Sequence, residues 1–176
     1  KSLNKGIELV ILSQVKPGFT RKIKWPKEKL FYQVETLVFG NAIKRALFPE
    51  RIIVGSNNPN SKKQLHIYNF YKLFTKKIIK MNFESAEIAK ISINLILIAN
   101  VSVANEIGSI CENINANWSD IFNALVLDKR IGKHAYIKTG LGLSGGNLER
   151  DLYNSINICK NNSISDNFFQ SMLLSS

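Results

Sequence analysis

The chain has 176 residues, of which 45% are hydrophobic and 21% are charged, and its formal net charge is +11. This composition excludes a mainly disordered chain, and the length suits one ordinary domain or two small ones. The excess charge comes mostly from lysines scattered between Lys16 and Lys80, without a stripe of arginine and aromatic residues. We therefore expect no nucleic-acid partner, and the same charge suits attraction for a phosphorylated small molecule equally well.

The first 82 residues alternate short apolar runs with amphipathic segments. Strands are expected at residues 8–13, 29–34, 51–55 and 76–81, and helices at about 41–47 and 64–75. A polar loop at residues 56–63 is the most obvious linker. Strands that alternate with helices predict an α/β unit with a largely parallel sheet.

After Asn82 the pattern is helical throughout. Residues 84–117 contain no proline and one glycine, Gly108, so we expect one helix of roughly 50 Å. Its middle is apolar on nearly every side, which favours a spine or a subunit-packing element. Further helices are expected at 118–127, at about 148–160 and at 166–174. The fold class is therefore α/β followed by all-α, with the boundary near residues 81–84.

Cysteine usage and hydropathy bear on the compartment. Cys111 and Cys159 have no metal-ligand spacing and suggest no disulfide framework, so we expect two buried thiols. We expect no secretory signal. The apolar run within 84–117 is interrupted by Lys90 and by asparagines, and we expect it to fall short of the ~20 apolar residues of a membrane span. These features predict a cytoplasmic protein without a metal or a membrane partner.

Lys90 and Asn94 lie four residues apart in the expected long helix and so share one face. A lysine that enters an apolar surface is costly to desolvate and is usually kept for a partner or a reaction. A lysine that extends to solvent is the structural alternative. The residues alone leave both alternatives open.

Three further segments have the composition of site loops. Glu35 follows the expected strand 29–34, at the edge of an open sheet that faces a ligand crevice, although a solvated glutamate is the commoner alternative. Arg130 lies in a turn that ends at Gly132 and could bind a phosphate or carboxylate, or could stabilise a helix end. The run GLGLSGGN at 140–147 could offer backbone amides to a ligand.

Six segments together fit one enzyme family in order and spacing. They are SQVKPGFT at 13–20, YQVETLVFGNA at 32–42, FPERIIVG at 48–55, the helix 84–106, DKRIG at 128–132 and GLGLSGGNLERD at 140–151. On these segments the chain resembles the nucleotide-sugar dehydrogenases, the group that contains UDP-glucose 6-dehydrogenase and GDP-mannose dehydrogenase. The resemblance implies a partial Rossmann-like NAD-binding domain over 1–82 and a helical dimerisation and catalytic domain over 83–176.

The resemblance also implies roles, because the family oxidises a nucleotide-sugar alcohol to a carboxylate in two NAD-dependent steps. Lys90 would stabilise the developing oxyanion, and Asn94 would hold a water or a substrate oxygen beside it. Asp151 would act as acid and base through that water. Glu35 would assist hydrolysis of the covalent intermediate, and together with Ser13 and Gln14 it would contact the cofactor.

The substrate and the partner follow from the same resemblance. Substrate-binding residues would be Leu37, Arg130, Gly142, Gly145 and Gly146. Arg130 would reach into the sugar site of a partner subunit in a homodimer formed through the 84–117 helix.

Two departures from the family pattern limit these expectations. The nucleophilic cysteine of the family stands four residues before Asp151, and this chain has Asn147 there. Asparagine cannot form the thiohemiacetal that the second oxidation needs, so we expect at most one two-electron step. No Gly-x-Gly-x-x-Gly follows a strand, so the NAD phosphate-binding turn is missing from the chain. The alternative function is a catalytically impaired scaffold or a sugar-binding subunit.

Overall fold

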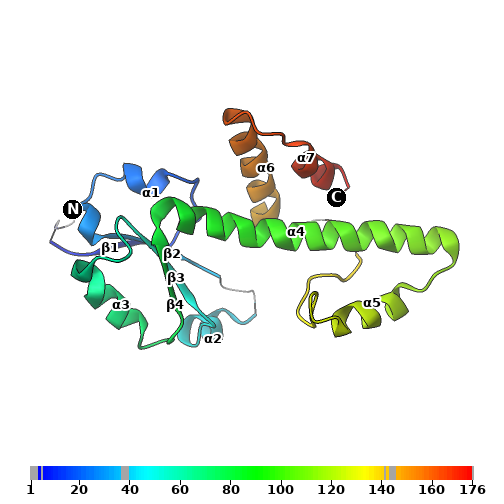
Figure 1. The fold of residues 1–176 in the computed structure, drawn as a ribbon, viewed down its shortest axis with the longest axis horizontal. Coiled ribbons are helices and arrows are strands. Elements are labelled where there is room, and N and C mark those ends of the chain that lie inside the picture. The colour runs from blue at the N-terminus through cyan, green and yellow to red at the C-terminus, as the bar shows by residue number, and fades with distance from the viewer. Residues whose placement is uncertain (1–3, 5, 37–39, 141, 143–145, 176) are drawn as a thin grey trace. The chain divides into compact units, whose positions relative to one another are not determined.

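The structure is a computed structural model that describes residues 4, 6–36, 40–140, 142 and 146–175. The chain divides into two compact units, Lys1–Lys90 and Ile91–Ser176. The first contains the sheet and the second is helical, as Figure 1 shows by label and colour. The fold class predicted from the sequence is therefore confirmed.

A four-stranded sheet forms the first unit. Its strands are β1 (Leu9–Ile11), β2 (Leu30–Val34), β3 (Ile52–Ser56) and β4 (Ile78–Asn82), in the order β1-β2-β3-β4. The pairs β1–β2 and β3–β4 are parallel, whereas β2 and β3 are antiparallel, with Tyr32 opposite Gly55. The sheet is thus largely parallel, as predicted, with one reversal at its centre.

Short helices accompany this sheet. They are α1 (Phe19–Lys22), α2 (Ala42–Leu47), α3 (Leu65–Tyr71) and the 3-10 helices η1 (Lys27–Lys29) and η2 (Lys62–Gln64). The core of the unit joins strand and α3 residues: Phe31, Ile52, Val54, Ile67, Tyr68 and Tyr71. The sequence pattern missed α1, η1 and η2, because segments of three or four residues are too short to show a helical period.

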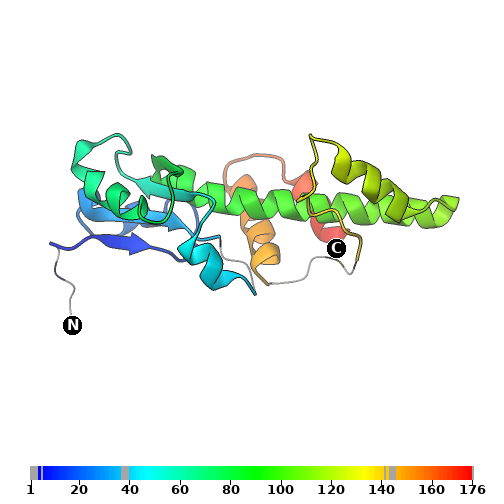
Figure 2. The same ribbon diagram turned by 90° about the horizontal axis from the view of Figure 1, so that it is seen from below.

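The second unit is built on α4 (Phe83–Ile114), which starts in the first unit and has 32 residues. After it come α5 (Trp118–Leu127), α6 (Gly146–Asn161) and α7 (Asn167–Leu174). Figures 1 and 2 show α6 standing across α4 and α5 turning back after α4 ends. Ile98 of α4 packs with Leu152, Ile156 and Met172 of α6 and α7 in the core of this unit. All four predicted helices are confirmed.

One face of α4 is apolar and uncovered in the single chain. Ile96, Val103 and Ile110 follow one another at intervals of seven residues and are 64%, 56% and 56% exposed. We call these three residues the α4 row. The apolar middle of the helix is therefore uncovered on this side within one chain, because no described element of this chain covers the row.

By length and composition α4 is apolar enough to cross a membrane, with 33% of the relevant window buried. The expectation that its apolar run is too short is therefore wrong on this criterion. One such helix is a weak indication, since the core helix of a soluble protein meets the same criterion. The absence of a membrane partner remains an expectation.

Candidate functional site

Two of the predicted catalytic side chains meet in the second unit. Asn94 on α4 donates a hydrogen bond from Nδ2 to Oδ2 of Asp151 on α6, at 2.6 Å. Asp151 is completely buried and Asn94 is 7% exposed. Asp151 lies between Leu148 and Leu152 of α6, which pack with Ile98 of α4 in one core cluster, so this side of α6 lies on the long helix.

The second carboxyl oxygen of Asp151 has no hydrogen-bond partner among the described residues, although it is buried. Leaving such an oxygen without a donor costs about 1–3 kcal/mol, and more when the carboxyl group is charged. Ser155 donates to the backbone carbonyl of Asp151 at 2.8 Å, so it does not supply that donor. This oxygen of Asp151 can therefore accept a hydrogen bond from a donor such as a water molecule or a hydroxyl group.

Lys90 precedes Asn94 by one turn of α4, on the same face. Its side chain is half-buried, and within the described part of the chain no hydrogen bond or ion pair engages its ammonium group. A partly desolvated cation without a carboxylate partner is suited to meet an anion.

Asn147 lies in the first turn of α6, one turn before Asp151, and is exposed. Its side-chain oxygen accepts a hydrogen bond from Nη2 of Arg150 at 2.9 Å. Position 147, where the resemblance implies a nucleophile, is therefore accessible. It carries a side-chain amide whose oxygen is hydrogen-bonded to Arg150.

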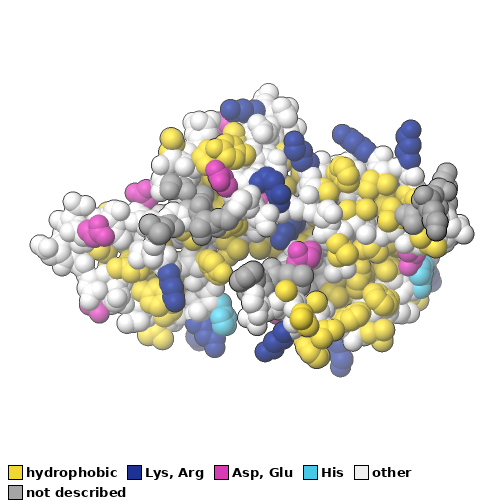
Figure 3. All heavy atoms as spheres, turned by 180° about the vertical axis from the view of Figure 1, so that it is seen from behind, with side chains coloured by type: hydrophobic (Ala, Val, Ile, Leu, Met, Phe, Trp, Pro, Cys, Tyr) yellow, Lys and Arg dark blue, Asp and Glu magenta, His cyan; other side chains and the backbone are white. Residues whose placement is uncertain are grey.

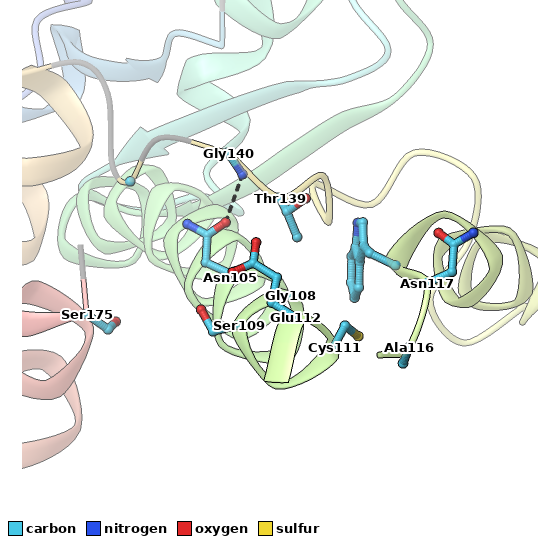
Figure 4. A pocket seen from close by; sticks show the side chains of 12 residues that line it. Asn105, Gly108, Ser109, Cys111, Glu112, Ala116, Asn117, Thr139, Gly140 and Ser175 are labelled. Carbon is cyan, nitrogen blue, oxygen red and sulfur yellow. Dashed lines mark hydrogen bonds between the residues drawn. The ribbon is translucent and has the colours of Figure 1, made fainter. Parts of the chain in front are cut away.

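The glycine-rich segment begins beside the later turns of α4. The backbone amide of Gly140 donates to Oδ1 of Asn105 at 3.0 Å, the dashed line in Figure 4. A Cβ at Gly108 would lie 2.8 Å from Cγ2 of Thr139, so a larger residue at this helix position would require the Thr139 side chain to shift. An open pocket of about 820 Å³ lies here, and Gly140 and Gly142 form part of its wall.

A second pocket, of about 510 Å³, shares these glycines and is basic. Its lining includes Lys133, His134, Tyr136, Lys138, Gly140 and Gly142. The sequence analysis missed the two lysines, the histidine and the tyrosine, because single charges without a motif do not stand out in a lysine-rich chain. Gly146, a further predicted substrate residue, is exposed at the start of α6. Gly145 and Leu37 lie outside the described residues.

Glu35 lines a pocket of about 320 Å³ in the first unit, at the end of β2. Arg45, Arg51 and Tyr71 line the same pocket, and sequence reasoning found none of them. Burial, with a smaller contribution from nearby Glu8, raises the pKa of Tyr71 to about 12, so its phenol stays protonated. This is an aromatic pocket with an acid and two arginines in its wall.

The predicted cofactor residues Ser13 and Gln14 follow β1, with Ser13 exposed and Gln14 partly buried. Since β1 and β2 are parallel, these residues and Glu35 come after strands that end at the same edge of the sheet. Open α/β sheets bind dinucleotides at that edge. The described chain thus brings all three predicted cofactor residues to one edge.

Arg130 is held by its own turn in the single chain. Its amide and Nε donate to Oδ1 of Asp128 at 2.9 and 3.0 Å, and Nη2 donates to Oδ2 at 2.6 Å. The hydrogen bond raises the pKa of Arg130 and lowers that of Asp128. Gly132 closes the turn by donating to the Asp128 carbonyl at 2.8 Å. The Arg130 side chain is 88% exposed, so a second molecule can reach its guanidinium.

Basic side chains do not gather into one stripe on the face of the described residues drawn in Figure 3. Lys and Arg side chains there are separated by apolar and uncharged ones, and apolar side chains form the larger groups. The absence of a nucleic-acid partner remains an expectation.

Residues 84–175 match the central domain of the UDP-glucose/GDP-mannose dehydrogenase family. The chain belongs to this family. The matched region includes the Asn94–Asp151 pair, Lys90 and the glycine-rich segment, so the family and the geometry point to the same part of the molecule.

Individual relatives agree with the family match. The UDP-glucose 6-dehydrogenase of Rickettsia prowazekii (strain Madrid E) is 32% identical over 182 residues, which cover 99% of this chain and 42% of that protein. A UDP-glucose dehydrogenase from the hyperthermophilic archaeon Pyrobaculum islandicum superposes with a TM-score of 0.83 at 25% identity, over 94% of this chain and 40% of that one.

The fold recurs in a relative with a different sugar in its name. UDP-D-ManNAc dehydrogenase from Pyrococcus horikoshii has a TM-score of 0.70 at 21% identity, over 86% of this chain and 38% of that one, which shows the fold alone. The chain therefore spans less than half of the length of these three relatives.

Proposed function

We propose that the protein is an NAD-dependent oxidoreductase that acts on the CH–OH group of a nucleotide sugar. The observation that carries this proposal is the buried Asn94–Asp151 pair, whose carboxylate keeps one oxygen without a partner among the described residues. The half-buried ammonium of Lys90 precedes Asn94 by one turn of the same helix. Removal of a hydroxyl proton requires an acid–base group and a cation that stabilises the resulting negative charge.

In this mechanism the substrate hydroxyl loses its proton toward Asp151, through a water that Asn94 orients. Lys90 stabilises the negative charge that develops on the oxygen as the proton leaves. NAD, when bound, supplies the hydride acceptor. Ser13, Gln14 and Glu35 suit part of an NAD site, because they follow the parallel strands β1 and β2 at one sheet edge.

The oxidation would stop after one two-electron step. A thiol at position 147 could add to an aldehyde and carry the second oxidation, whereas the amide of Asn147 is not a nucleophile of that kind. The expected product is therefore an aldehyde or a ketone. Glu35, which the resemblance assigns to hydrolysis of a covalent intermediate, would then have no intermediate to hydrolyse.

The substrate would bind beside the glycine-rich segment. Lys133 and Lys138 give the pocket of about 510 Å³ two positive charges, which suit the diphosphate of a nucleotide sugar. Backbone amides at Gly142 and Gly146 would add donors without side-chain obstruction. The assignments of Leu37 and Gly145 to substrate binding stay predictions.

We also propose a homodimer formed through α4. The three exposed apolar residues of the α4 row repeat every seven positions. This is the spacing found where two helices pack side by side. The guanidinium of Arg130, in a turn after α5, is then available to a site in the partner subunit. A cytoplasmic location belongs to the same proposal.

A scaffold or sugar-binding subunit without activity is the second candidate, and Asn147 is the observation that favours it. The experiment that separates the candidates counts NADH per sugar when the protein is incubated with NAD and UDP-glucose or GDP-mannose. One NADH per sugar supports the one-step dehydrogenase, and two with a uronic acid product contradict the one-step limit. Sugar binding by calorimetry with no NADH supports the scaffold.

Asp151→Asn is expected to lower turnover roughly 10²–10⁴-fold.

A further inference from the structure

A buried carboxylate of α4 holds the turn that precedes α1. Glu87 is completely buried and accepts two backbone hydrogen bonds, from Gly18 to Oε2 at 2.5 Å and from Thr20 to Oε1 at 2.7 Å. Each carboxyl oxygen therefore has its own donor. Burial of a glutamate is costly unless it is satisfied in this way, so the contact is specific and not incidental.

The turn needs this carboxylate because its own residues cannot cap α1. Gly18 is the N-cap of α1, has φ +83° and has no side chain to accept the first free amides of the helix. Glu87 takes the place of a capping side chain, although it lies more than 60 positions later in the sequence. The start of α1 is thus fixed by α4 and not by local sequence.

A second carboxylate of α4 binds the other end of α1. Arg21 donates through Nε and Nη2 to the two oxygens of Glu84, and through Nη1 to Asn57 at 2.9 Å. Glu84 and Glu87 are three residues apart and share a face of α4. The pair joins α1 to the first turns of α4, although the Arg21–Glu84 contact is exposed and therefore the weaker of the two.

The position of Glu87 relates this turn to the proposed chemistry. Lys90 follows Glu87 by three residues in α4, and Ser13 and Gln14 precede Gly18 in the segment that leaves β1. We propose that Glu87 is a positioning residue, which acts through the Gly18–Thr20 turn. Through this turn it fixes the predicted cofactor residues Ser13 and Gln14 relative to Lys90. This inference rests on the proposed function for the identity of the cofactor.

The first test measures amide hydrogen exchange in the wild-type chain and in Glu87→Gln. Glutamine keeps the shape but turns one acceptor into a donor, so one of the two amides must lose its bond. Exchange at Gly18, at Thr20 or at both is expected to speed up about tenfold or more, with little change at Val54 in the centre of the sheet. Glu28→Gln, which removes an exposed carboxylate of η1, is the matched control and is expected to change neither amide.

The second test measures NAD affinity and the KM values of the same variants. In Glu87→Gln the Kd or KM for NAD is expected to rise about tenfold while the KM for the sugar stays within twofold. Glu87→Asp, which keeps two acceptor oxygens, is expected to recover part of the lost affinity. Substitution of a residue that only stabilised the fold would not raise the KM for NAD while leaving the KM for the sugar unchanged.

The outcomes are distinct. Unchanged exchange at Gly18 and Thr20 overturns the anchoring by Glu87, and faster exchange with unchanged NAD affinity overturns its positioning role. Absence of NAD binding by the wild-type protein overturns the proposed function and the cofactor part of this inference. The exchange measurement then still decides whether Glu87 holds the turn.

Discussion

Nδ2 of Asn94 lies 2.6 Å from Oδ2 of Asp151, although 57 positions separate the two residues in the sequence. The contact joins α4 to α6 at a point where both side chains are buried, so it contributes to the fold as well as to the proposed site. It also holds one oxygen of Asp151 and leaves the other for a ligand.

Asn94→Ala should lower the free energy of unfolding by about 1–3 kcal/mol, because it leaves a buried carboxyl group without its donor. Urea denaturation at neutral pH measures the change. Asn113→Ala is the matched control, since Asn113 is exposed on the same helix and donates only to the Ser109 carbonyl. Equal effects of the two substitutions would contradict a special role of the Asn94 amide.

Asn147→Cys should place one reactive thiol on the native protein. Cys111 and Cys159 are buried, so the wild-type chain is expected to react slowly with a thiol reagent until it unfolds. The variant should show one fast-reacting thiol, and in the proposed reaction it should raise the yield toward two NADH per sugar. A slow thiol at position 147 would show that the exposed first turn of α6 is covered in solution.

Thr20→Val should leave stability unchanged or raise it by up to about 1 kcal/mol. The hydroxyl of Thr20 is buried and has no partner among the described residues, so its removal loses no described hydrogen bond. Thr75→Val is the contrasting variant, because the Thr75 hydroxyl accepts from the Lys77 amide at 3.2 Å. Chemical denaturation of both variants measures the difference, and a clear loss of stability in Thr20→Val would point to a partner for the hydroxyl.

The Arg21–Glu84 ion pair predicts a pH dependence. The hydrogen bond from Arg21 lowers the pKa of Glu84 below its usual 4.5, so the folded state holds this proton less strongly than the unfolded state does. The stabilisation is therefore fully present above the unfolded pKa and disappears as the pH falls through the folded value. Both side chains are more than one-third exposed, so we expect less than about 1 kcal/mol.

Thermal unfolding of wild type and Glu84→Gln tests this dependence. The difference in midpoint should be present near pH 7, shrink below about pH 4.5 and decrease with added salt. A difference that grows toward low pH would have the wrong sign for this pair.

Val103→Glu should convert the proposed dimer into a monomer, because it places a charge at the centre of the α4 row. Sedimentation velocity measures the mass. Lys72→Glu, at the exposed residue that follows α3, is the control and should leave the mass unchanged. A wild-type protein that sediments as a monomer would remove the dimer from the proposal.

The sequence was informative where a period of hydrophobic residues is long enough to count. The 32 residues of α4 contain no proline, and the apolar runs of β2 and β3 are bounded by polar segments, so the limits of the two strands were predicted to within one residue and those of the helix to within three. The antiparallel pairing of β2 with β3 was not predictable, because alternation within a strand does not depend on its direction.

Residues that act through tertiary contacts were beyond the sequence pattern. Nothing local marks α1 as a helix, because its cap is Glu87 and its last turn is bound by Glu84. The family resemblance placed Asn94 and Asp151 in one site with a water between them, and their direct hydrogen bond was not predicted. Arg45 and Arg51 became site candidates only when the fold brought them to the pocket of Glu35.

Gly108 has a consequence for attempts to stabilise the protein. Glycine inside a helix costs about 1 kcal/mol relative to alanine, so a search for thermostable variants would select this position first. An added methyl group would press on Thr139, whose neighbour Gly140 is tied to Asn105. Gly108→Ala is therefore the substitution in the long helix that is most expected to raise thermal stability and also the one most expected to lower ligand affinity.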